Sequence, residues 1–396
     1  MTRFFLFLGL CFLLSTSSAQ DDPLFADQTL TVDNLDDPSL ANFLRPHMEN
    51  SQFIMVGEQH FIQEVGMVTK TVYELAEGFG YHTLCIENDA LMAAQISRMA
   101  AADDPAGAAR DFHKQFPFTV AFYENDEDYD LLSHVVKSGG TLWGIDQTLM
   151  SQFRFNYSYL IEHTKSEAFA EKLQEQLDIA TAAYEEAMRD KRFQAVYYFK
   201  YNQALNEELL ELAQTEEEKE IIFQLGKTKE IYDYNLGGQY YLNNEVRGQL
   251  MKSNFMRYYR AAQEDEAMPK VVFKLGASHT YRGLTPTRIY DISNLATELA
   301  NMNGQRSLHI KVLGISGTNN IGFPFAPESK TEFDNTEDFP QEIQDWLEGL
   351  EADKYAVLNL EPLRQKARSY STEMQKLMFA HDIFILVRDA QPLTTF

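Results

Sequence analysis

Short apolar segments of strand type alternate with amphipathic helical segments in the first third of the chain, and strand-type runs return after residue 270. The segments 51–56 and 83–86 are compact apolar runs, and residues 61–79 between them place apolar side chains at helical spacing. Such a β-α-β order is typical of a parallel sheet whose crossover helices cover its faces. The same reasoning predicts strands at 140–145, 270–275, 308–313, 355–360 and 383–387, and helices at 90–101 and 129–136. The sequence therefore predicts an α/β fold with a mostly parallel sheet flanked by helices.

A long segment without strand-type runs interrupts this alternation. Residues 150–260 contain no proline and are rich in Glu, Gln, Ala, Leu and Tyr, a composition that favours helix throughout. We therefore predict an all-α lobe at 150–260, inserted between the third and fourth strands of an α/β core domain formed by 51–149 and 261–396. The tyrosines of this lobe either pack between its helices or line an amphipathic substrate groove.

The N-terminal residues predict export. Arg3 gives the start of the chain a positive charge, residues 4–14 form an apolar run, and small or polar residues precede Ala19. This is the pattern of a secretory signal peptide over 1–19, and we expect an Asp-rich leader segment over 20–50 to follow it. The expected location is periplasmic or extracellular. No transmembrane segment is expected after cleavage, because no other apolar run approaches the roughly 18 residues of a membrane span.

The net charge limits the kinds of molecule that this protein can bind, and the cysteine content limits the disulfides that it can form. The formal net charge of −25, from 59 acidic and 34 basic residues, argues against nucleic acid and anionic membranes as partners. A small-molecule substrate is the partner that we expect instead. Removal of the signal peptide would leave one cysteine, Cys85, which lies inside the second expected strand and is predicted to pack in the core. No disulfide framework is therefore expected.

Acidic and histidine side chains follow four successive expected strands at the point where each strand ends. Glu58 and His60 follow the first strand, Glu87 the second, Asp146 the third and His279 the fourth. The carboxyl ends of parallel strands meet at one edge of a sheet, which is where open α/β sheets bind their ligands. A helix cap would explain Asp146 on its own, but histidine is not a favoured cap. The sequence therefore predicts a functional site at this edge.

These residue types suit hydrolysis, with or without a metal ion. A neutral imidazole can take a proton from water when a carboxylate, here Glu87 or Glu58, holds its tautomer. Glu64 lies four residues after His60 and would share a face with it on a helix. His60, His279 and Glu58 could also bind zinc, manganese or iron, and the residue types alone leave both alternatives open. The sequence contains none of the short motifs of zinc proteases, serine hydrolases, phosphate-binding loops or dinucleotide-binding folds.

The motif Gly57-Glu58-Gln59-His60, followed by Glu64, resembles the Gly-Glu-x-x-His-Gly-x-x-Glu opening of the erythromycin esterase family. That family belongs to a wider group with ChaN-like haem-binding proteins and TIKI/TraB-type proteins. The resemblance runs through most of the chain in the family's order. Its further matches are Glu87, Gly144-Ile145-Asp146, Arg247 with Met251 and Asn254, His279, and His381-Asp382.

The chain departs from the family's pattern at three places. One residue separates Glu58 from His60 where the esterases have two, which is closer to the ChaN-like Gly-Glu-x-His. Phe61 stands where the family has the glycine after its histidine. Gly248 follows Arg247 where the family has an aspartate.

The resemblance implies a metal-independent hydrolase of an ester or lactone, with a helical lobe over its cleft. It implies that His60 activates water, that Glu87 orients this base, and that His279 assists. Glu58 and Arg247 would support them, and no cofactor is expected. The residues expected to bind substrate or support the site are Glu64, Asp146 and Arg247.

Three other roles are alternatives to this hydrolase, and two of them use the same edge of the sheet. A ChaN-like binding protein would capture haem or another cofactor, with His60, His279 or a tyrosine of the helical lobe as axial ligand. A metal-dependent hydrolase of the TIKI/TraB kind would bind its ion through His60, His279 and Glu58. A purely structural role is the third.

Overall fold

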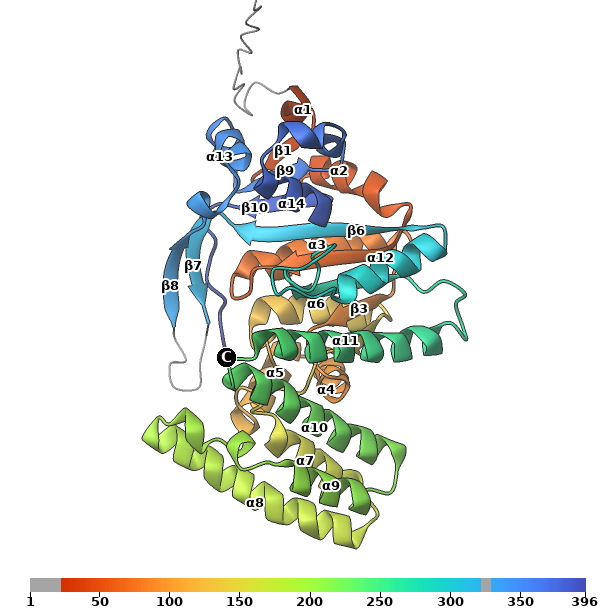
Figure 1. Ribbon diagram of the computed structural model, residues 1–396, viewed down its shortest axis with the longest axis vertical. Helices are drawn as coiled ribbons and strands as arrows, with labels where there is room; N and C mark the ends of the chain where they lie inside the picture. Colours follow the sequence, from red (N-terminus) through yellow and green to blue (C-terminus); the bar gives the residue numbers. More distant parts are fainter. Residues whose placement is uncertain (1–22, 322–328) are drawn as a thin grey trace, which may run out of the picture.

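An eight-stranded sheet runs through the computed structural model, which describes residues 23–321 and 329–396 (Figure 1). The predicted signal peptide at 1–19 lies outside the described residues. The strand order is β1-β9-β10-β6-β2-β5-β3-β4. The strands are β1 (Thr29–Val32), β2 (Ser51–Glu58), β3 (Thr83–Ile86), β4 (Thr141–Gly144), β5 (Val271–Gly276), β6 (Arg306–Gly314), β9 (Tyr355–Asn359) and β10 (Ile383–Val387).

Most neighbouring strands of this sheet are parallel. β10, β6, β2, β5, β3 and β4 pair in parallel, whereas β9 pairs antiparallel with both β10 and β1. The predicted α/β fold with a mostly parallel sheet is therefore confirmed. Glu58 at the end of β2 lies in register with Gly276 at the end of β5, so these strand ends meet at one edge.

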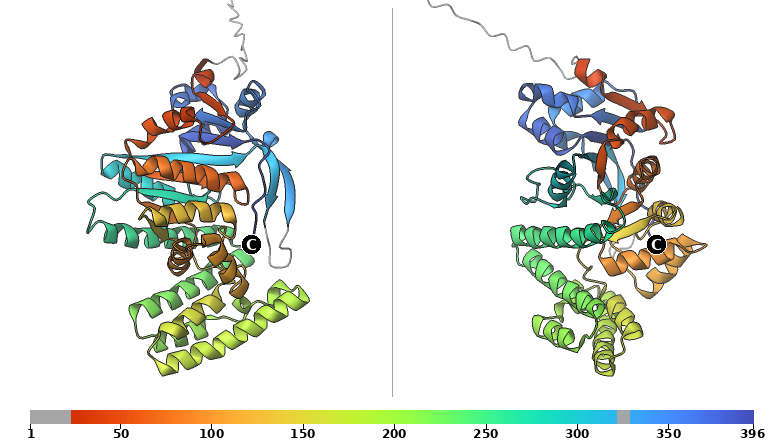
Figure 2. Two further views of the ribbon diagram at one scale, coloured as in Figure 1. Left: turned by 180° about the vertical axis from the view of Figure 1, so that it is seen from behind. Right: turned by 90° about the vertical axis from the view of Figure 1, so that its right-hand side faces the viewer.

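Helices cover both faces of the sheet (Figure 2). They are α2 (Pro38–Met48), α3 (Gln63–Glu77), α4 (Ala90–Ala100), α5 (Pro105–Gln115), α6 (Asp126–Lys137), α11 (Tyr240–Ala262), α12 (Ile292–Met302), α13 (Gln341–Glu348) and α14 (Thr372–Ala380). Ile54 and Val56 of β2 join a core cluster with residues of α2 to α6, whereas Phe53 and Met55 join a second cluster with α11 and α12. Burial on both faces explains why the strands are continuous apolar runs.

The helical lobe between β4 and β5 packs around its own aromatic core. Tyr157, Tyr198 and Tyr201 are buried there, so these tyrosines pack between helices. The last helix of the segment, α11, leaves this core and packs on the sheet through Met251 and Phe255. The lobe lies at one end of the molecule in Figure 1. Its other helices are α7 (Phe153–His163), α8 (Glu167–Asp190), α9 (Gln203–Leu212) and α10 (Glu216–Leu236).

Some elements of the structure have no clear signal in the sequence. β7 (Ser316–Asn320) and β8 (Lys330–Asp334) form an antiparallel hairpin, although their sequences are mostly polar. The edge strand β1 lies in the 20–50 segment, for which the sequence left strand and loop open, and the polar helix α5 was not predicted. The remaining short elements are α1 (Pro23–Ala26) and 3₁₀ segments at Phe193–Ala195, Tyr197–Phe199, Thr336–Asp338 and Pro362–Ser369.

The structure also bears on the predicted burial of Cys85 and on the search for a membrane-spanning helix. Cys85 is fully buried on β3, as predicted, and burial raises the pKa of its thiol well above the usual value. Over the two described ranges, no helix has both the length and the apolar character needed to cross a membrane.

Candidate active site

The predicted strand-end residues meet at the carboxyl edge of the parallel strands. Glu58 is the last residue of β2, and Glu87 follows β3 directly. Asp146 and His279 come shortly after β4 and β5. The parallel pairing of β2, β5, β3 and β4 brings all four loops to the same edge. We call this group the strand-end cluster.

His60 is held by a carboxylate on one side and an aromatic ring on its face. Its Nδ1 lies 2.8 Å from Oε1 of Glu58, and its ring stacks on Phe122 with centroids 3.9 Å apart and planes 8° from parallel. The prediction gave the orienting role to Glu87, but it is Glu58 that bonds His60. The reason is local geometry, because the short turn after β2 folds the imidazole back onto the strand's own last residue.

Glu58 is itself fixed by a buried lysine that the sequence analysis did not include. Nζ of Lys274 lies 2.7 Å from Oε2 of Glu58 and 3.2 Å from Oδ1 of Asp128, and all three side chains are buried. Burial alone would raise the pKa of Glu58, but Lys274 and His60 more than offset it and lower that pKa below its usual value. The lysine within the apolar strand Val271–Gly276 could have predicted this ion pair, because a buried charge needs partners of opposite charge.

Glu87 stands between the two histidines. Its Oε2 accepts a hydrogen bond from the backbone N–H of Gly276 at 2.6 Å, and its Oε1 lies 3.5 Å from Nε2 of His279. A Cβ atom on Gly276 would lie 2.8 Å from Nε2 of His60 and 3.4 Å from Oε2 of Glu87. Glycine at this position therefore lets His60 and Glu87 meet over the end of β5.

Arg247 joins the helical segment to the strand-end cluster. From α11 its Nε and Nη2 bond the two carboxylate oxygens of Asp146 at 2.8 and 2.5 Å, and Nη2 also lies 2.8 Å from Oε1 of Glu87. Burial opposes ionisation of Glu87, but His279, His60 and Arg247 together hold its pKa well below the usual range. The cluster therefore keeps a buried carboxylate and a partly buried guanidinium charged.

His279 is paired with an aspartate that the sequence analysis missed. Its Nδ1 lies 2.8 Å from Oδ2 of Asp291, whose other oxygen caps α12 by accepting the Ile292 N–H at 2.7 Å. Burial would lower the pKa of His279, but Glu87 and Asp291 raise it to about 10. In sequence, Asp291 looks only like a helix cap, so its second role becomes visible only in three dimensions.

Comparison with solved structures identifies the fold around this cluster. A variant of the erythromycin esterase EreC in its open conformation is 16% identical, has a TM-score of 0.62, and covers 91% of this chain and 98% of its own. The chain has the erythromycin esterase fold. A Bacillus cereus protein (13% identical, TM-score 0.57, covering 93% and 97%) and a succinoglycan biosynthesis protein (14%, 0.57, covering 93% and 96%) are also similar. No protein-family model matches the sequence, and no curated protein sequence does.

Glu64 lies apart from the strand-end cluster in this erythromycin esterase fold. Its carboxylate pairs with Nζ of Lys354 at 2.7 Å and accepts from the backbone N–H of Gln391. His60 lies in a turn, and α3 begins only at Gln63, so the shared helix face expected for His60 and Glu64 is not formed. Glu64 instead ties α3 to the C-terminal segment.

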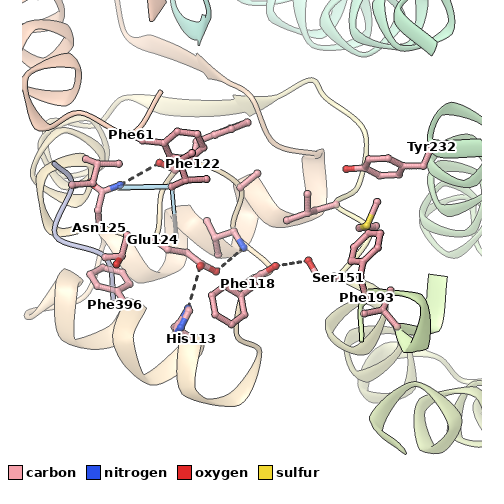
Figure 3. A pocket seen from close by; sticks show the side chains of 18 residues that line it. Phe61, His113, Phe118, Phe122, Glu124, Asn125, Ser151, Phe193, Tyr232 and Phe396 are labelled. Carbon is pink, nitrogen blue, oxygen red and sulfur yellow. Dashed lines mark hydrogen bonds and ion pairs between the residues drawn. The ribbon is translucent and has the colours of Figure 1, made fainter. Parts of the chain in front are cut away.

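One cavity adjoins the strand-end cluster at Asp146, and a second cavity, drawn in Figure 3, shares lining residues with the first. A polar one of about 170 Å³ is lined by Asp146, Arg247 and Tyr232 among others. A larger, mostly apolar one of about 600 Å³ is lined by Phe61, Phe122 and Tyr232 together with residues of the lobe. Phe122 and Tyr232 line both, so the erythromycin esterase fold here offers an apolar pocket beside a charged centre.

The carboxylate suggested as a metal ligand, Glu58, is already paired within the protein. Nζ of Lys274 lies 2.7 Å from it, and Nε2 of His279 faces Oε1 of Glu87 at 3.5 Å. Across the described ranges, no group of three or more His, Cys, Asp or Glu side chains is arranged to hold a metal ion. Cations of the protein itself therefore occupy the places beside these carboxylates.

Replacing Asp291 with asparagine is expected to lower the pKa of His279. The wild-type imidazole should titrate at about pH 10, because Glu87 and Asp291 favour its charged form over the opposing effect of burial. Since its pKa is raised on folding, the stability that it contributes is complete below its unfolded pKa of about 6.5 and is lost as pH rises toward 10. Nuclear magnetic resonance titration of the His279 ring measures its pKa in the wild type and in the variant. An unchanged titration midpoint in Asp291→Asn would contradict the assignment.

Proposed function

We propose that this protein hydrolyses an ester or lactone bond of a small, partly apolar molecule, with His60 as the general base. The observation that carries the proposal is the Glu58–His60 pair, which lies beside Glu87 and whose imidazole stacks on Phe122, a lining residue of the apolar pocket. A carboxylate on Nδ1 leaves Nε2 of a neutral imidazole free to take a proton. The erythromycin esterase fold supports a hydrolase of this general kind.

In the proposed reaction, Nε2 of His60 accepts a proton from a water molecule as the water oxygen attacks the carbonyl carbon. Glu58 steadies the imidazolium that forms, and Lys274 keeps Glu58 ionised. The tetrahedral intermediate then collapses, the bond to the alcohol oxygen breaks, and the proton on His60 passes to that oxygen. Water and ester are thereby converted into acid and alcohol.

Arg247 and His279 are the groups that we assign to the developing negative charge. His279 carries a positive charge at neutral pH because its pKa lies near 10. Nη1 of Arg247 is free of hydrogen-bond partners among the described residues, whereas Nε and Nη2 bond Asp146 and Glu87. Fixed cations of this kind stabilise an oxyanion strongly because they need no rearrangement during the reaction.

We also propose that the reaction needs no metal ion or other cofactor. Each carboxylate that could hold an ion is already paired, Glu58 with Lys274 and both Glu87 and Asp146 with Arg247. Hydrolysis of a panel of neutral aryl and alkyl esters and lactones, measured with and without a chelator, tests both the hydrolase activity and its independence of a metal ion. We expect turnover that the chelator leaves unchanged. Failure to cleave any of them, or activity that zinc restores after chelation, would overturn the proposal.

Two further expectations accompany the hydrolase. Haemin titration should leave the Soret band unshifted, because Phe122 covers one face of the His60 ring and Nε2 of His279 already faces Oε1 of Glu87 at 3.5 Å. A shift that disappears in a His60→Ala variant would support the binding-protein alternative instead. We also propose export of the mature chain, which N-terminal sequencing of protein recovered outside the cytoplasm would test by finding cleavage near Ala19.

A further inference from the structure

Three phenylalanines of the apolar pocket have left-handed backbones. Phe61, Phe118 and Phe122 have φ values of 76°, 59° and 63°, and they make up half of the six non-glycine residues with positive φ in the described ranges. All three line the same cavity of about 600 Å³. Bulky side chains rarely adopt this conformation, because Cβ then crowds the neighbouring carbonyl. Strained residues gathered at one pocket point to a function of that pocket.

Each of these strained peptides is held by a different part of the chain. The Phe61 carbonyl accepts hydrogen bonds from the backbone N–H groups of Asn320 and Leu393, at 3.1 and 3.4 Å. The Phe118 carbonyl accepts from the hydroxyl of Ser151, and the Phe122 carbonyl accepts from Nδ2 of Asn125 at 3.2 Å. The surroundings therefore fix the backbone from which the three rings project in advance of any ligand.

The rings lie next to the proposed base. Phe122 stacks on the imidazole of His60, and the Phe61 and Phe122 centroids are 6.0 Å apart. Figure 3 shows these rings along one wall of the cavity, with Tyr232 and Phe193 on the side of the helical lobe. A group bound against this aromatic wall, defined as Phe61, Phe118 and Phe122, would therefore sit one ring away from the reacting atoms.

The polar groups of the cavity are committed to the protein itself. Glu124 accepts the Val120 N–H at 3.1 Å and lies 3.3 Å from Nδ1 of His113. Asn125 donates to the Phe122 carbonyl and to Asp128. A ligand is therefore held mainly by contacts with aromatic rings, and the Glu124 carboxylate disfavours an anionic one.

We propose that this pocket binds a neutral aromatic group of the substrate, so that the enzyme prefers aryl-bearing esters to alkyl esters of similar size. Offset and edge-to-face ring contacts favour an aromatic group over a flexible alkyl chain, and the fixed rings need no ordering on binding. The place of the aryl group beside a scissile ester rests on the proposed hydrolase function, whereas binding to the pocket can be tested without turnover.

Binding of two stable amides tests the pocket directly. The probes are N-(1-naphthyl)acetamide and N-octylacetamide, titrated into the full protein by calorimetry. We expect the naphthyl amide to bind about tenfold more tightly, the difference that one good aromatic contact supplies. Phe61→Gly and Phe118→Gly, in which glycine accepts the left-handed backbone and only the ring is lost, should each weaken naphthyl binding about tenfold. Phe379→Ala, on the exposed surface of α14, is the matched control and should change nothing.

The outcomes separate the pocket from the reaction. Equal affinity for the two amides, or full naphthyl affinity in both glycine variants, would overturn the aromatic pocket even if the protein cleaves esters. Tight, ring-dependent naphthyl binding by a protein that cleaves no ester would uphold the pocket and remove the hydrolase proposal. Melting temperatures of the variants distinguish a lost ring from a lost fold.

Discussion

Replacing His60 with alanine should lower kcat/KM for a cleaved ester by about 100- to 10,000-fold, the usual contribution of a general base. The imidazole is the group that we assign to proton transfer, and Glu58 would have no base to orient once it is gone. The free energy of unfolding should change by no more than about 1 kcal/mol, because the ring is partly exposed and Glu58 keeps its pairing with Lys274. Steady-state kinetics and chemical denaturation measure the two effects.

A matched control separates loss of the base from loss of a histidine in general. His163, at the end of α7 in the helical lobe, is exposed and contacts Tyr159 of its own helix, through Nδ1 to the carbonyl and by ring stacking. His163→Ala should therefore keep activity and most of the stability. The His60→Ala variant should also keep its affinity for the naphthyl amide. Full activity in His60→Ala would remove His60 from the mechanism.

The strands of the sheet could be predicted because burial on both faces leaves a strong signal. Residues of β2 alternate between two core clusters, so the whole strand must be apolar. The hairpin of β7 and β8 lacks this signal, since its residues are mostly polar and its pairing depends on a distant segment. Helix α3 was predicted to begin at 61, but the left-handed backbone of Phe61 and the extended one of Ile62 delay it to Gln63.

The candidate site could be predicted as far as strand order determines it. Glu58, Glu87 and His279 come together because parallel strands end at one edge. The partners that set their charges come from elsewhere in the chain, as Asp128 does from α6 and Asp291 from the cap of α12. Such pairings depend on packing between elements, and spacing along the sequence carries no trace of them.

Replacing Lys274 with methionine should destabilise the protein by about 3–5 kcal/mol at neutral pH, the usual cost of removing one partner from a buried ion pair. The change would leave Glu58 and Asp128 as neighbouring carboxylates, each only 4% exposed or less, without their shared cation. At present burial lowers the pKa of Lys274, but Asp128 and Glu58 outweigh it and raise that pKa well above its usual value. The methionine variant would reverse this balance, and the pKa values of both carboxyls should rise.

The pH dependence of the stability of Lys274→Met, and a control variant at a second lysine, show whether the lost charge causes the destabilisation. Carboxyl groups whose pKa is raised on folding bind protons more readily in the native state, so Lys274→Met should lose stability as pH rises above about 4. Its deficit relative to wild type should therefore be smaller at pH 4.5 than at pH 7. Lys311 on β6 is a partly buried lysine without a carboxylate partner in the described ranges, and burial lowers its pKa to about 8. Lys311→Met should accordingly be as stable as wild type or more so, and an equal loss in both variants would show that Lys274 acts by packing and not by charge.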